Sequence, residues 1–315
     1  MARDASIPHA PPVELAVPRS FEARYGAGVD RGLCLGGGGL FFVAWQTAYL
    51  RTLAAHGLRF DNADRVVGTS AGSLVASVLV AGKLNRFHSE ISVLAKAPAL
   101  VSTLAPASQL RPSQQRALDL FLKATDSEVP TLQEIGHAAL AAVTPKPDAT
   151  RRNISLVIGR GRWTSDALHI TCVDTYTGER CVVTRKAAIT MTRAIAASSA
   201  VPGVFAPQPI GDRRCMDGGV SGTGTHLDLL AGATRVLILA LHDGSDLTEG
   251  MMTSHPDAAL QELEDLKRSG ASVVVRTPAE VDLMELMSPS SVPRALAMGA
   301  RQASDDIGLL STFWA

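Results

Sequence analysis

The chain has 315 residues, which is long enough to bury a large hydrophobic core, and we expect one α/β domain in preference to two smaller units. Lys plus Arg and Asp plus Glu cancel at 30 each, so no basic surface predicts a nucleic-acid partner and no acidic tail predicts a charged one. Apolar residues make up 46% of the sequence but aromatic residues only 4%, which favours parallel strands packed under helices over a β-sandwich.

The cysteines are widely spaced and form neither a C-x-x-C pair nor a His/Cys cluster with zinc-ligand spacing. We therefore expect no metal, no cofactor and a reducing compartment, with unpaired thiols at all four positions. Two of them flank a predicted hairpin and could face each other, but the register cannot be fixed from the sequence. The four are Cys34, Cys172, Cys181 and Cys215.

The N-terminus is rich in proline and has no apolar core of the signal-peptide type, so residues 1–28 are predicted to be a flexible arm. Two uncharged apolar runs, residues 32–50 and 66–82, contain glycines that divide each into strand, turn and helix, which argues against membrane spans. We expect a cytoplasmic protein and leave open whether it makes peripheral contact with membranes.

The chain then follows a strand-loop-helix pattern twice within about 50 residues. Residues 31–35 predict a buried strand that ends in four glycines, and residues 41–55 predict a helix. A second strand at 64–67 leads into another apolar helix. This pattern indicates a parallel sheet with right-handed crossovers, in which functional loops meet at the carboxyl ends of the strands. The expected fold is a three-layer α/β/α arrangement with a largely parallel central sheet.

Residues 85–148 predict a mainly helical insertion into a single domain that spans 29–315. Within it, Ser113 is placed to cap a helix that ends near Lys123, and residues 131–134 resemble a capping box that opens a second helix through Val143. This block could cover the site or could serve only for packing.

The remainder of the chain predicts further strands, one helix and a rigid proline-containing loop at residues 199–207. The helix is expected over residues 186–198, and a C-terminal helical region closes the chain. The strands are expected at residues 154–158, 168–173, 181–184, 214–217, 236–241 and 272–276.

A G-x-S-x-G sequence centred on Ser70 lies between the second strand and its helix. The pattern is typical of a nucleophile elbow, a turn so tight that side chains two residues either side of the serine would clash. Gly68 and Gly72 occupy those positions. Ser70 is therefore predicted to be a nucleophile held at the positive end of a helix dipole.

The run Gly36, Gly37, Gly38 and Gly39 follows the first strand. It does not fit G-x-G-x-x-G, since the last position falls on Phe41 or Phe42, and no P-loop lysine follows. Successive amides without side chains can point at one atom, so we predict an oxyanion hole; loss of one such donor typically costs about 3 to 4 kcal/mol in the transition state.

The serine needs a base, and two readings remain open. An α/β-hydrolase with the order Ser-Asp-His would use His226, His242 or His255. Against this, the elbow comes after only about two strands, and none of the histidines sits in a motif that directs it to the site. Asp217 is the sharper candidate, because it ends a strand-like run and is followed by two glycines that let the chain turn away.

Taken together, the motifs resemble the patatin-like phospholipase family. The resemblance rests on the glycine run, the elbow at 68–72, the A-S-S-A-V-P-G-V-F-A-P loop at 197–207 and D-G-G at 217–219, in the family's order and approximate spacing. It implies a patatin-like fold and a serine-aspartate dyad in which Ser70 attacks a lipid ester and Asp217 takes its proton, with no metal. The implied partner is a lipid or small ester substrate.

The chain departs from the family pattern at two places. Leu40, Phe41 and Phe42 stand where a basic residue and a further glycine usually follow the glycine run. Residues 220–225 lack the usual Asn-Asn-x-Pro after D-G-G. These changes bear on the head-group preference more than on the reaction type. The missing basic residue supports a catalytically silent patatin-like module that binds lipid or a partner, which stays as an alternative beside a histidine-dependent esterase.

Overall fold

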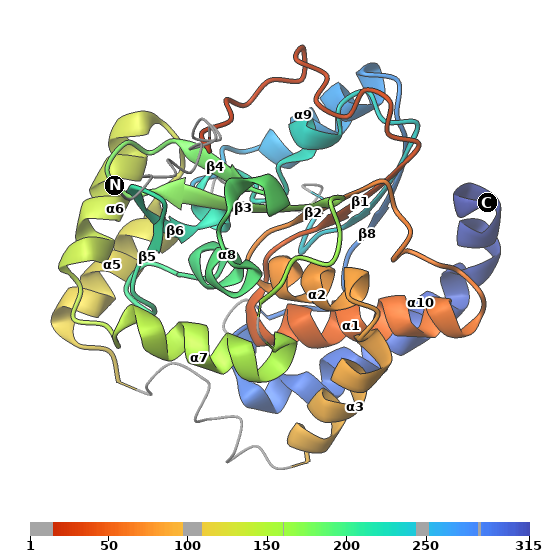
Figure 1. The fold of residues 1–315 in the computed structure, drawn as a ribbon, viewed down its shortest axis with the longest axis horizontal. Helices are drawn as coiled ribbons and strands as arrows, with labels where there is room; N and C mark the ends of the chain where they lie inside the picture. Colours follow the sequence, from red (N-terminus) through yellow and green to blue (C-terminus); the bar gives the residue numbers. More distant parts are fainter. Residues whose placement is uncertain (1–14, 97–108, 160, 244–251, 283–284) are drawn as a thin grey trace, which may run out of the picture.

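The computed structural model describes residues 15–96, 109–159, 161–243, 252–282 and 285–315, in which a central β-sheet lies between helices (Figure 1). The strands are β1 (Arg31–Leu35), β2 (Arg65–Gly68), β3 (Leu168–Asp174), β4 (Arg180–Val183), β5 (Gln208–Ile210), β6 (Arg213–Asp217), β7 (Arg235–Leu239) and β8 (Ser272–Arg276). The α-helices are α1 (Gly39–Ala55), α2 (Ala71–Val80), α3 (Leu84–Leu94), α5 (Pro112–Lys123), α6 (Val129–Ala141), α7 (Pro147–Ile158), α8 (Met191–Ser198), α9 (Ala258–Arg268) and α10 (Val292–Trp314). Short 3-10 helices are η1 (Arg185–Ala187), η2 (Gly218–Val220), η3 (Leu227–Leu230) and η5 (Pro289–Ser291).

The sheet runs in the order β5-β6-β3-β2-β1-β7-β8, and β4 also pairs with β3. All neighbours from β3 to β8 along this order are parallel. The exceptions lie at the other end, where β4 and β6 run antiparallel to β3 and β5 runs antiparallel to β6. The predicted largely parallel sheet in an α/β/α arrangement is confirmed.

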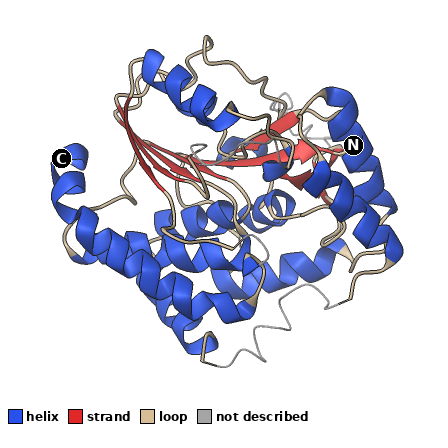
Figure 2. Cartoon of the chain, turned by 180° about the vertical axis from the view of Figure 1, so that it is seen from behind, coloured by secondary structure: helices blue, strands red, loops and turns tan. Residues whose placement is uncertain are grey.

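Alternate residues of the parallel strands face different layers, as the two-residue period of a strand requires. In β1, Leu33 and Leu35 belong to the core cluster that includes the residues of α1 and α10, whereas Cys34 belongs to the cluster that includes Leu263 and Leu266 of α9. Figures 1 and 2 show α1, α2 and α10 on one side of the sheet and α9 on the other.

The longest helix, α10, packs along α1 under the sheet (Figure 1). Trp45 stacks between Phe42 and Tyr49 on α1, and its indole N–H donates to Gln302 Oε1 at 2.8 Å. The Tyr49 hydroxyl donates to Asp306 at 2.6 Å, so the buried polar tips of the aromatic side chains are satisfied by α10. This packing fixes α1, the helix that begins within the glycine run.

Strand register brings the end of β6 to the end of β2. Ile170 of β3 pairs with Gly68, the last residue of β2, and β3 continues beyond this point. Two residues further, Cys172 pairs with Asp217, the last residue of the antiparallel strand β6. Asp217 therefore reaches the site from the direction opposite to that of the parallel strands, which the sequence pattern did not indicate.

Two predicted elements are wrong. Residues 154–158 were expected as a strand but form the last turns of α7, because Pro147 starts a helix in which Ile154, Val157 and Ile158 recur at helical spacing and pack on the core. The single helix expected over 186–198 is η1 followed by α8, since Ala188 between them has a left-handed φ of 55°.

The helical insertion is helical where the structure describes it, but its caps differ from expectation; residues 97–108 lie outside the described part. The predicted capping box at 131–134 is wrong, because α6 already begins at Val129 with Pro130 in its first turn. Ser113 does not cap α5, whose N-cap is Arg111; its hydroxyl accepts from the Val143 amide instead.

The described part of the predicted arm, residues 15–28, is packed against the body of the protein. The Val17 amide donates to Arg180 O, the Gly26 amide to Ala231 O, and Phe21 and Tyr25 pack against the same face of the sheet as α9. The apolar residues of this stretch sustain neither a helical nor a strand period, so the sequence did not signal the packing. The flexible arm stays a prediction for residues 1–14, and the division into arm and single domain stays a prediction as well.

All four cysteines are unpaired, as expected, and all are buried. Cys172 and Cys181 lie opposite each other across the β3–β4 hairpin.

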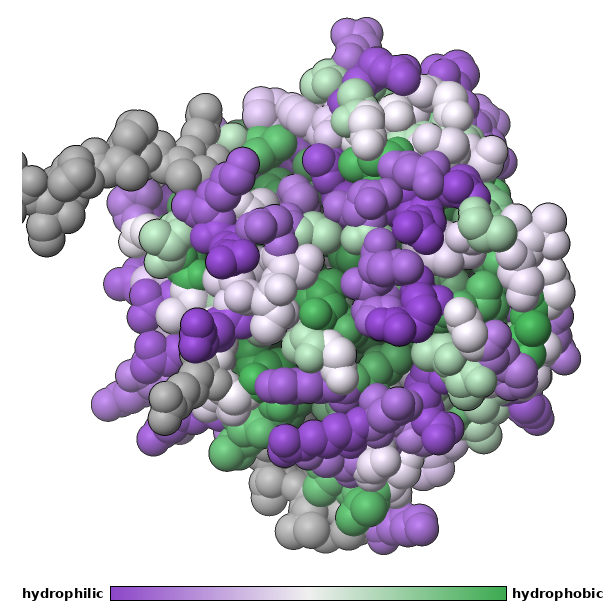
Figure 3. All heavy atoms as spheres, turned by 45° about the vertical axis from the view of Figure 1, so that its right-hand side comes forward, coloured by the Kyte–Doolittle hydropathy of each residue, from purple (hydrophilic) through white to green (hydrophobic). Residues whose placement is uncertain are grey.

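Among the described residues, no helix combines the length and apolar character needed to cross a bilayer. On the face in Figure 3, hydrophobic and hydrophilic residues are mixed over small areas. Exposed large apolar side chains lie on separate helices, such as Val93 on α3, Leu156 on α7 and Leu309 on α10.

The close contact between α2 and β1 predicts that a methyl group added at Gly72 lowers stability, whereas one added at Gly308 of α10 does not. A methyl group at Gly72 would lie 1.9 Å from Leu35 O, whereas one at Gly308 on α10 would meet nothing within 4 Å. We expect Gly72→Ala to lower the free energy of unfolding by about 2 to 3 kcal/mol or more, and Gly308→Ala to raise it by up to about 1 kcal/mol. Urea unfolding of both variants measures this; equal effects would contradict the packing described.

Candidate active site

Ser70 lies at the turn between β2 and α2 in a backbone conformation that side chains rarely adopt, with φ 51° and ψ −120°. The tight turn depends on the two flanking glycines. A Cβ at Gly68 would lie 2.8 Å from Ser73 Cα, and one at Gly72 would overlap Leu35 O. The clash expected from the G-x-S-x-G pattern is thus present at both positions, and Ser70 stands at the N-terminus of α2.

Asp217 is 3% exposed, and both of its carboxylate oxygens are hydrogen-bonded. Oδ2 accepts from the Ser70 hydroxyl at 2.7 Å, and Oδ1 accepts from the Gly219 amide at 2.8 Å. The two side chains predicted from separate motifs are therefore in contact. A hydrogen bond of this length allows the carboxylate to accept the serine proton directly.

Burial of the Asp217 carboxylate raises its pKa to about 7, because the charged form loses hydration; hydrogen bonds from Gly219 and Ser70 oppose this rise. A base works best when its pKa lies near the working pH, since it is then both available and strong enough to take a proton. Asp217 has this property without any histidine.

The glycine run lies against the serine. A Cβ at Gly37 would lie 3.2 Å from Ser70 Cβ, and Gly38 and Gly39 have φ of 154° and 61°, which favour glycine. The Gly36 amide donates to Leu239 O within the sheet, so it is not free to bind an oxyanion. The amides of Gly37, Gly38 and Gly39 are left as the candidate donors of the run.

Residues 198–200, within the A-S-S-A-V-P motif, hold the backbone of both Ser70 and Asp217. The Ser198 hydroxyl accepts from the Ser70 amide at 2.9 Å, and Ala200 O accepts from the Asp217 amide at 3.0 Å. Ser198 ends α8 and is fully buried. The A-S-S-A-V-P sequence was the available signal, but nothing in it indicated contacts to residues so distant in the chain.

The candidate histidines are not hydrogen-bonded to Ser70 in the described structure. His226 is buried, and its two ring nitrogens face Gly218 O at 3.1 Å and Arg19 Nη2 at 3.4 Å. His242 follows β7 and has a buried Nδ1 without a partner, and burial lowers the pKa of this side chain. His255 is exposed. The Ser70 hydroxyl donates to Asp217 instead.

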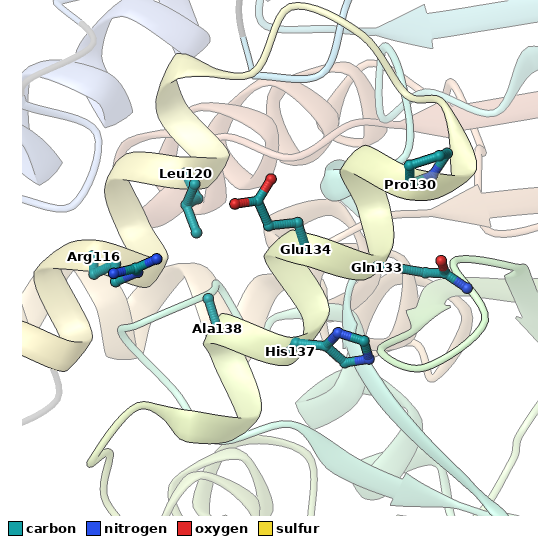
Figure 4. Close-up of a pocket in the computed structure, with 7 residues that line it drawn as sticks. All are labelled: Arg116, Leu120, Pro130, Gln133, Glu134, His137 and Ala138. Carbon is teal, nitrogen blue, oxygen red and sulfur yellow. The ribbon is translucent and has the colours of Figure 1, made fainter.

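Other features that could bind a ligand lie apart from these residues. A hollow of about 410 Å³ lies between α5 and α6, where Glu134 points toward α5 while Gln133 and His137 point away (Figure 4). An adjoining hollow of about 680 Å³ includes Leu120 and Ile135. Neither is lined by Ser70, Asp217 or the glycine run. Within the described residues, no group of three or more His, Cys, Asp or Glu side chains could hold a metal ion.

Residues 33–229, more than half of the chain, match the family model described as patatin-like phospholipase. Among solved structures, the chain is similar to VipD from Legionella pneumophila, with 12% identity, coverage of 90% of this chain and 68% of that one, and a TM-score of 0.41. It is also similar to the type III effector protein ExoU, with 15% identity, coverage of 89% and 54%, and a TM-score of 0.29. A third similarity is to the ExoU-SpcU complex from Pseudomonas aeruginosa, with 18% identity, coverage of 88% and 52%, and a TM-score of 0.31. The chain thus spans about half the length of the ExoU chains. No curated protein sequence gives a significant match.

The raised pKa of Asp217 predicts how stability depends on pH. Its pKa is about 7 in the folded protein and lies near 4 when unfolded. Between these values the folded state holds more protons than the unfolded state, so the free energy of unfolding falls as pH rises and levels off above pH 7, by about 4 kcal/mol at most.

Asp217→Asn cannot ionise, so the variant should lose this fall and become more stable than the wild type at pH 8. Urea unfolding at pH 5 and pH 8 measures the difference. If wild type and variant changed in parallel between the two pH values, the carboxylate would not carry a raised pKa.

Proposed function

This chain belongs to the patatin-like phospholipase family, and we propose that it is a serine acyl hydrolase that cleaves carboxylic ester bonds of lipids through a Ser70–Asp217 dyad. The family supports lipid hydrolysis in general. The assignment of the two residues is carried by one observation, the 2.7 Å hydrogen bond from the Ser70 hydroxyl to a buried carboxylate. Phospholipase A-type cleavage, in which one acyl chain of a phospholipid is released, is part of the proposal.

In the first half of the proposed reaction, Ser70 Oγ attacks the ester carbonyl while its proton passes to Asp217 Oδ2. The carbonyl oxygen becomes negative and is stabilised by the amides of Gly37, Gly38 and Gly39, with the positive end of the α2 dipole adding to the field. Collapse of this intermediate breaks the bond to the alcohol part of the lipid. The alcohol leaves with the proton that Asp217 held, and an acyl-serine remains.

In the second half, water attacks the acyl carbonyl and gives its proton to Asp217. The same amides stabilise the second oxyanion. When this intermediate collapses, the proton returns to Ser70 and the fatty acid is released. One carboxylate thus acts first as base and then as acid in each half, which suits a group with a pKa of about 7.

The substrate class requires that lipid reach Ser70, which is partly exposed. We keep the cytoplasmic location expected from the sequence as part of this proposal, and we add to it the peripheral contact with a lipid surface that the sequence left open. The helical insertion adjoins the loop at residues 199–207, which follows Ser198, because Gln114 of α5 donates to Gly203 O at 2.9 Å.

The dyad predicts which substitutions stop turnover of a short-chain nitrophenyl ester and of phospholipid in mixed micelles. Ser70→Ala should abolish the reaction, and Asp217→Asn should reduce kcat by about a thousandfold or more, because members of such a unit do not act additively. His242→Ala and His255→Ala should keep most of the activity.

A dead but folded His242 or His255 variant, combined with near-normal rates for Asp217→Asn, would replace the dyad by the histidine-dependent esterase. A wild-type protein that hydrolyses neither substrate would favour the silent lipid-binding module, for which the apolar residues after the glycine run are the supporting feature.

The pKa of Asp217 also predicts the pH dependence of the reaction. The carboxylate must be ionised to accept the serine proton, so kcat/KM should rise with pH, with an apparent pKa near 7, and level off above it. Initial rates at substrate concentrations below KM, measured from pH 5 to pH 9, report this value. A rate already on its plateau at pH 5 would show that the base is an ordinary carboxylate or another group.

A further inference from the structure

The loop that follows Asp217, residues 218–226, contacts the Asp217 carboxylate; we call it the Asp217 loop. Its Gly219 amide donates to Asp217 Oδ1. Further along, Gly222, Gly224 and His226 have φ of 65°, 70° and 54°. Backbone of this kind has little regular hydrogen bonding to hold it, so its position depends on side chains from elsewhere.

Arg19, which precedes β1 in the chain, binds the middle of the Asp217 loop. Its guanidinium donates to Ser221 O and to Glu262 Oε1, the latter at 3.2 Å. A Cβ at Gly222 would lie 2.5 Å from Arg19 Nη1, so this glycine leaves the space that the guanidinium needs. Arg19 thereby joins residue 221 of the loop to helix α9.

Glu262 of α9 holds the next part of the loop. Its Oε2 accepts from the hydroxyls of Thr223 at 2.6 Å and Thr225 at 3.1 Å, while Oε1 accepts from Arg19. The Glu262 side chain is 14% exposed and its contacts with the threonines are partly buried, whereas its contact with Arg19 is exposed. Both oxygens of one carboxylate are thus used to fix two loop residues and the arginine that holds a third.

His226 closes the loop onto its beginning. A guanidinium can only donate, so Nδ1 accepts from Arg19; a carbonyl can only accept, so Nε2 carries the proton and donates to Gly218 O. Burial, with the charges of Arg19 and Arg180, lowers the pKa of His226, which keeps this neutral form. Gly218 is the residue directly after Asp217, so the ring ties the two ends of the loop together.

Arg19 is itself held in place. Arg180 of β4 pairs with Asp228 in a buried salt bridge and also donates to the carbonyls of Val17 and Pro18. The Ser20 amide donates to Asp228 Oδ2 at 3.1 Å. The residues on both sides of Arg19 are therefore fixed to the sheet and to η3.

We propose that Arg19, Glu262 and His226 are positioning residues that hold the Asp217 loop, and through the Gly219 amide the Asp217 carboxylate, against Ser70. None of them touches the reacting atoms. The catalytic part of this inference rests on the proposed function, whereas the holding of the loop does not.

The test compares substitutions at Arg19, Glu262 and His226 with matched controls, either at other residues or as conservative changes at the same residue. Glu262→Ala is paired with Glu264→Ala, which lies exposed on the same helix. Arg19→Gln is paired with Arg276→Gln, which removes a similarly part-buried guanidinium from its Asp306 partner. His226→Leu is paired with His226→Gln, which retains a donor for Gly218 O. Glu262→Gln keeps the acceptor for the threonines and serves if a harsher variant does not fold.

Two quantities are measured on the full chain: kcat and KM for the nitrophenyl ester, and amide hydrogen exchange in peptides that cover 217–226. Glu262→Ala, Arg19→Gln and His226→Leu should each lower kcat at least tenfold with KM within twofold, and raise exchange in these peptides at least tenfold. Glu264→Ala and Arg276→Gln should leave both within twofold. His226→Gln should recover most of the loss. Glu262→Gln keeps one acceptor for the threonines but loses the acceptor for Arg19, so its kcat and exchange should still change by more than threefold.

The proposal is overturned if folded Arg19→Gln, His226→Leu and Glu262→Ala proteins, or Glu262→Gln where Glu262→Ala does not fold, keep kcat and exchange within twofold of wild type. It is overturned also if exchange rises while kcat is unchanged, if kcat falls while exchange is unchanged, or if the change is in KM alone. If the wild-type chain hydrolyses no ester, the proposed function fails, and the exchange measurements alone decide whether the three residues hold the loop.

Discussion

The hydrogen bond between the Ser70 hydroxyl and the Asp217 carboxylate joins two groups that are each unfavourable in isolation. The serine has a strained backbone, which typically costs about 1 to 3 kcal/mol, and the carboxylate is buried with a pKa of about 7. The surrounding fold must offset both costs. It does so through the register that places the end of β6 near the end of β2. In addition, Ser198 accepts a hydrogen bond from the Ser70 amide and Ala200 O accepts one from the Asp217 amide.

This constraint explains why the sheet changes direction at one side. A parallel strand in the place of β6 would run in the same direction as β2 and would approach the end of the sheet from the same side as β2. The antiparallel β6 instead ends where β3 extends past β2, so its last side chain meets the serine from the opposite side. The chain then turns away through Gly218 and Gly219, and the Gly219 amide donates to Asp217 Oδ1.

The sequence singled out Ser70 and Asp217 as candidates because each lies in a short motif with a local physical reason: glycines around Ser70 remove clashes, and glycines after Asp217 permit a turn. The strand predicted at residues 154–158 is wrong, because a short apolar run is equally compatible with a strand and with the end of a helix. The sequence could not indicate the contacts of Ser198, Arg19 or Glu262. The Ser198–Ser70 contact spans 128 residues and the Arg19–Glu262 contact 243, and even the threonines that Glu262 binds lie 37 and 39 residues before it. Only the three-dimensional topology brings these residues together.

The central claim is that Asp217 activates Ser70 as a nucleophile. Reaction with a fluorophosphonate, followed by peptide mass mapping, tests this most directly, because the probe bonds only to an activated serine and needs no knowledge of the natural lipid. We expect one adduct, on the peptide that carries Ser70, with a labelling rate that falls at least a hundredfold in Asp217→Asn. An adduct on another serine, or equal labelling rates in the two proteins, would contradict the account.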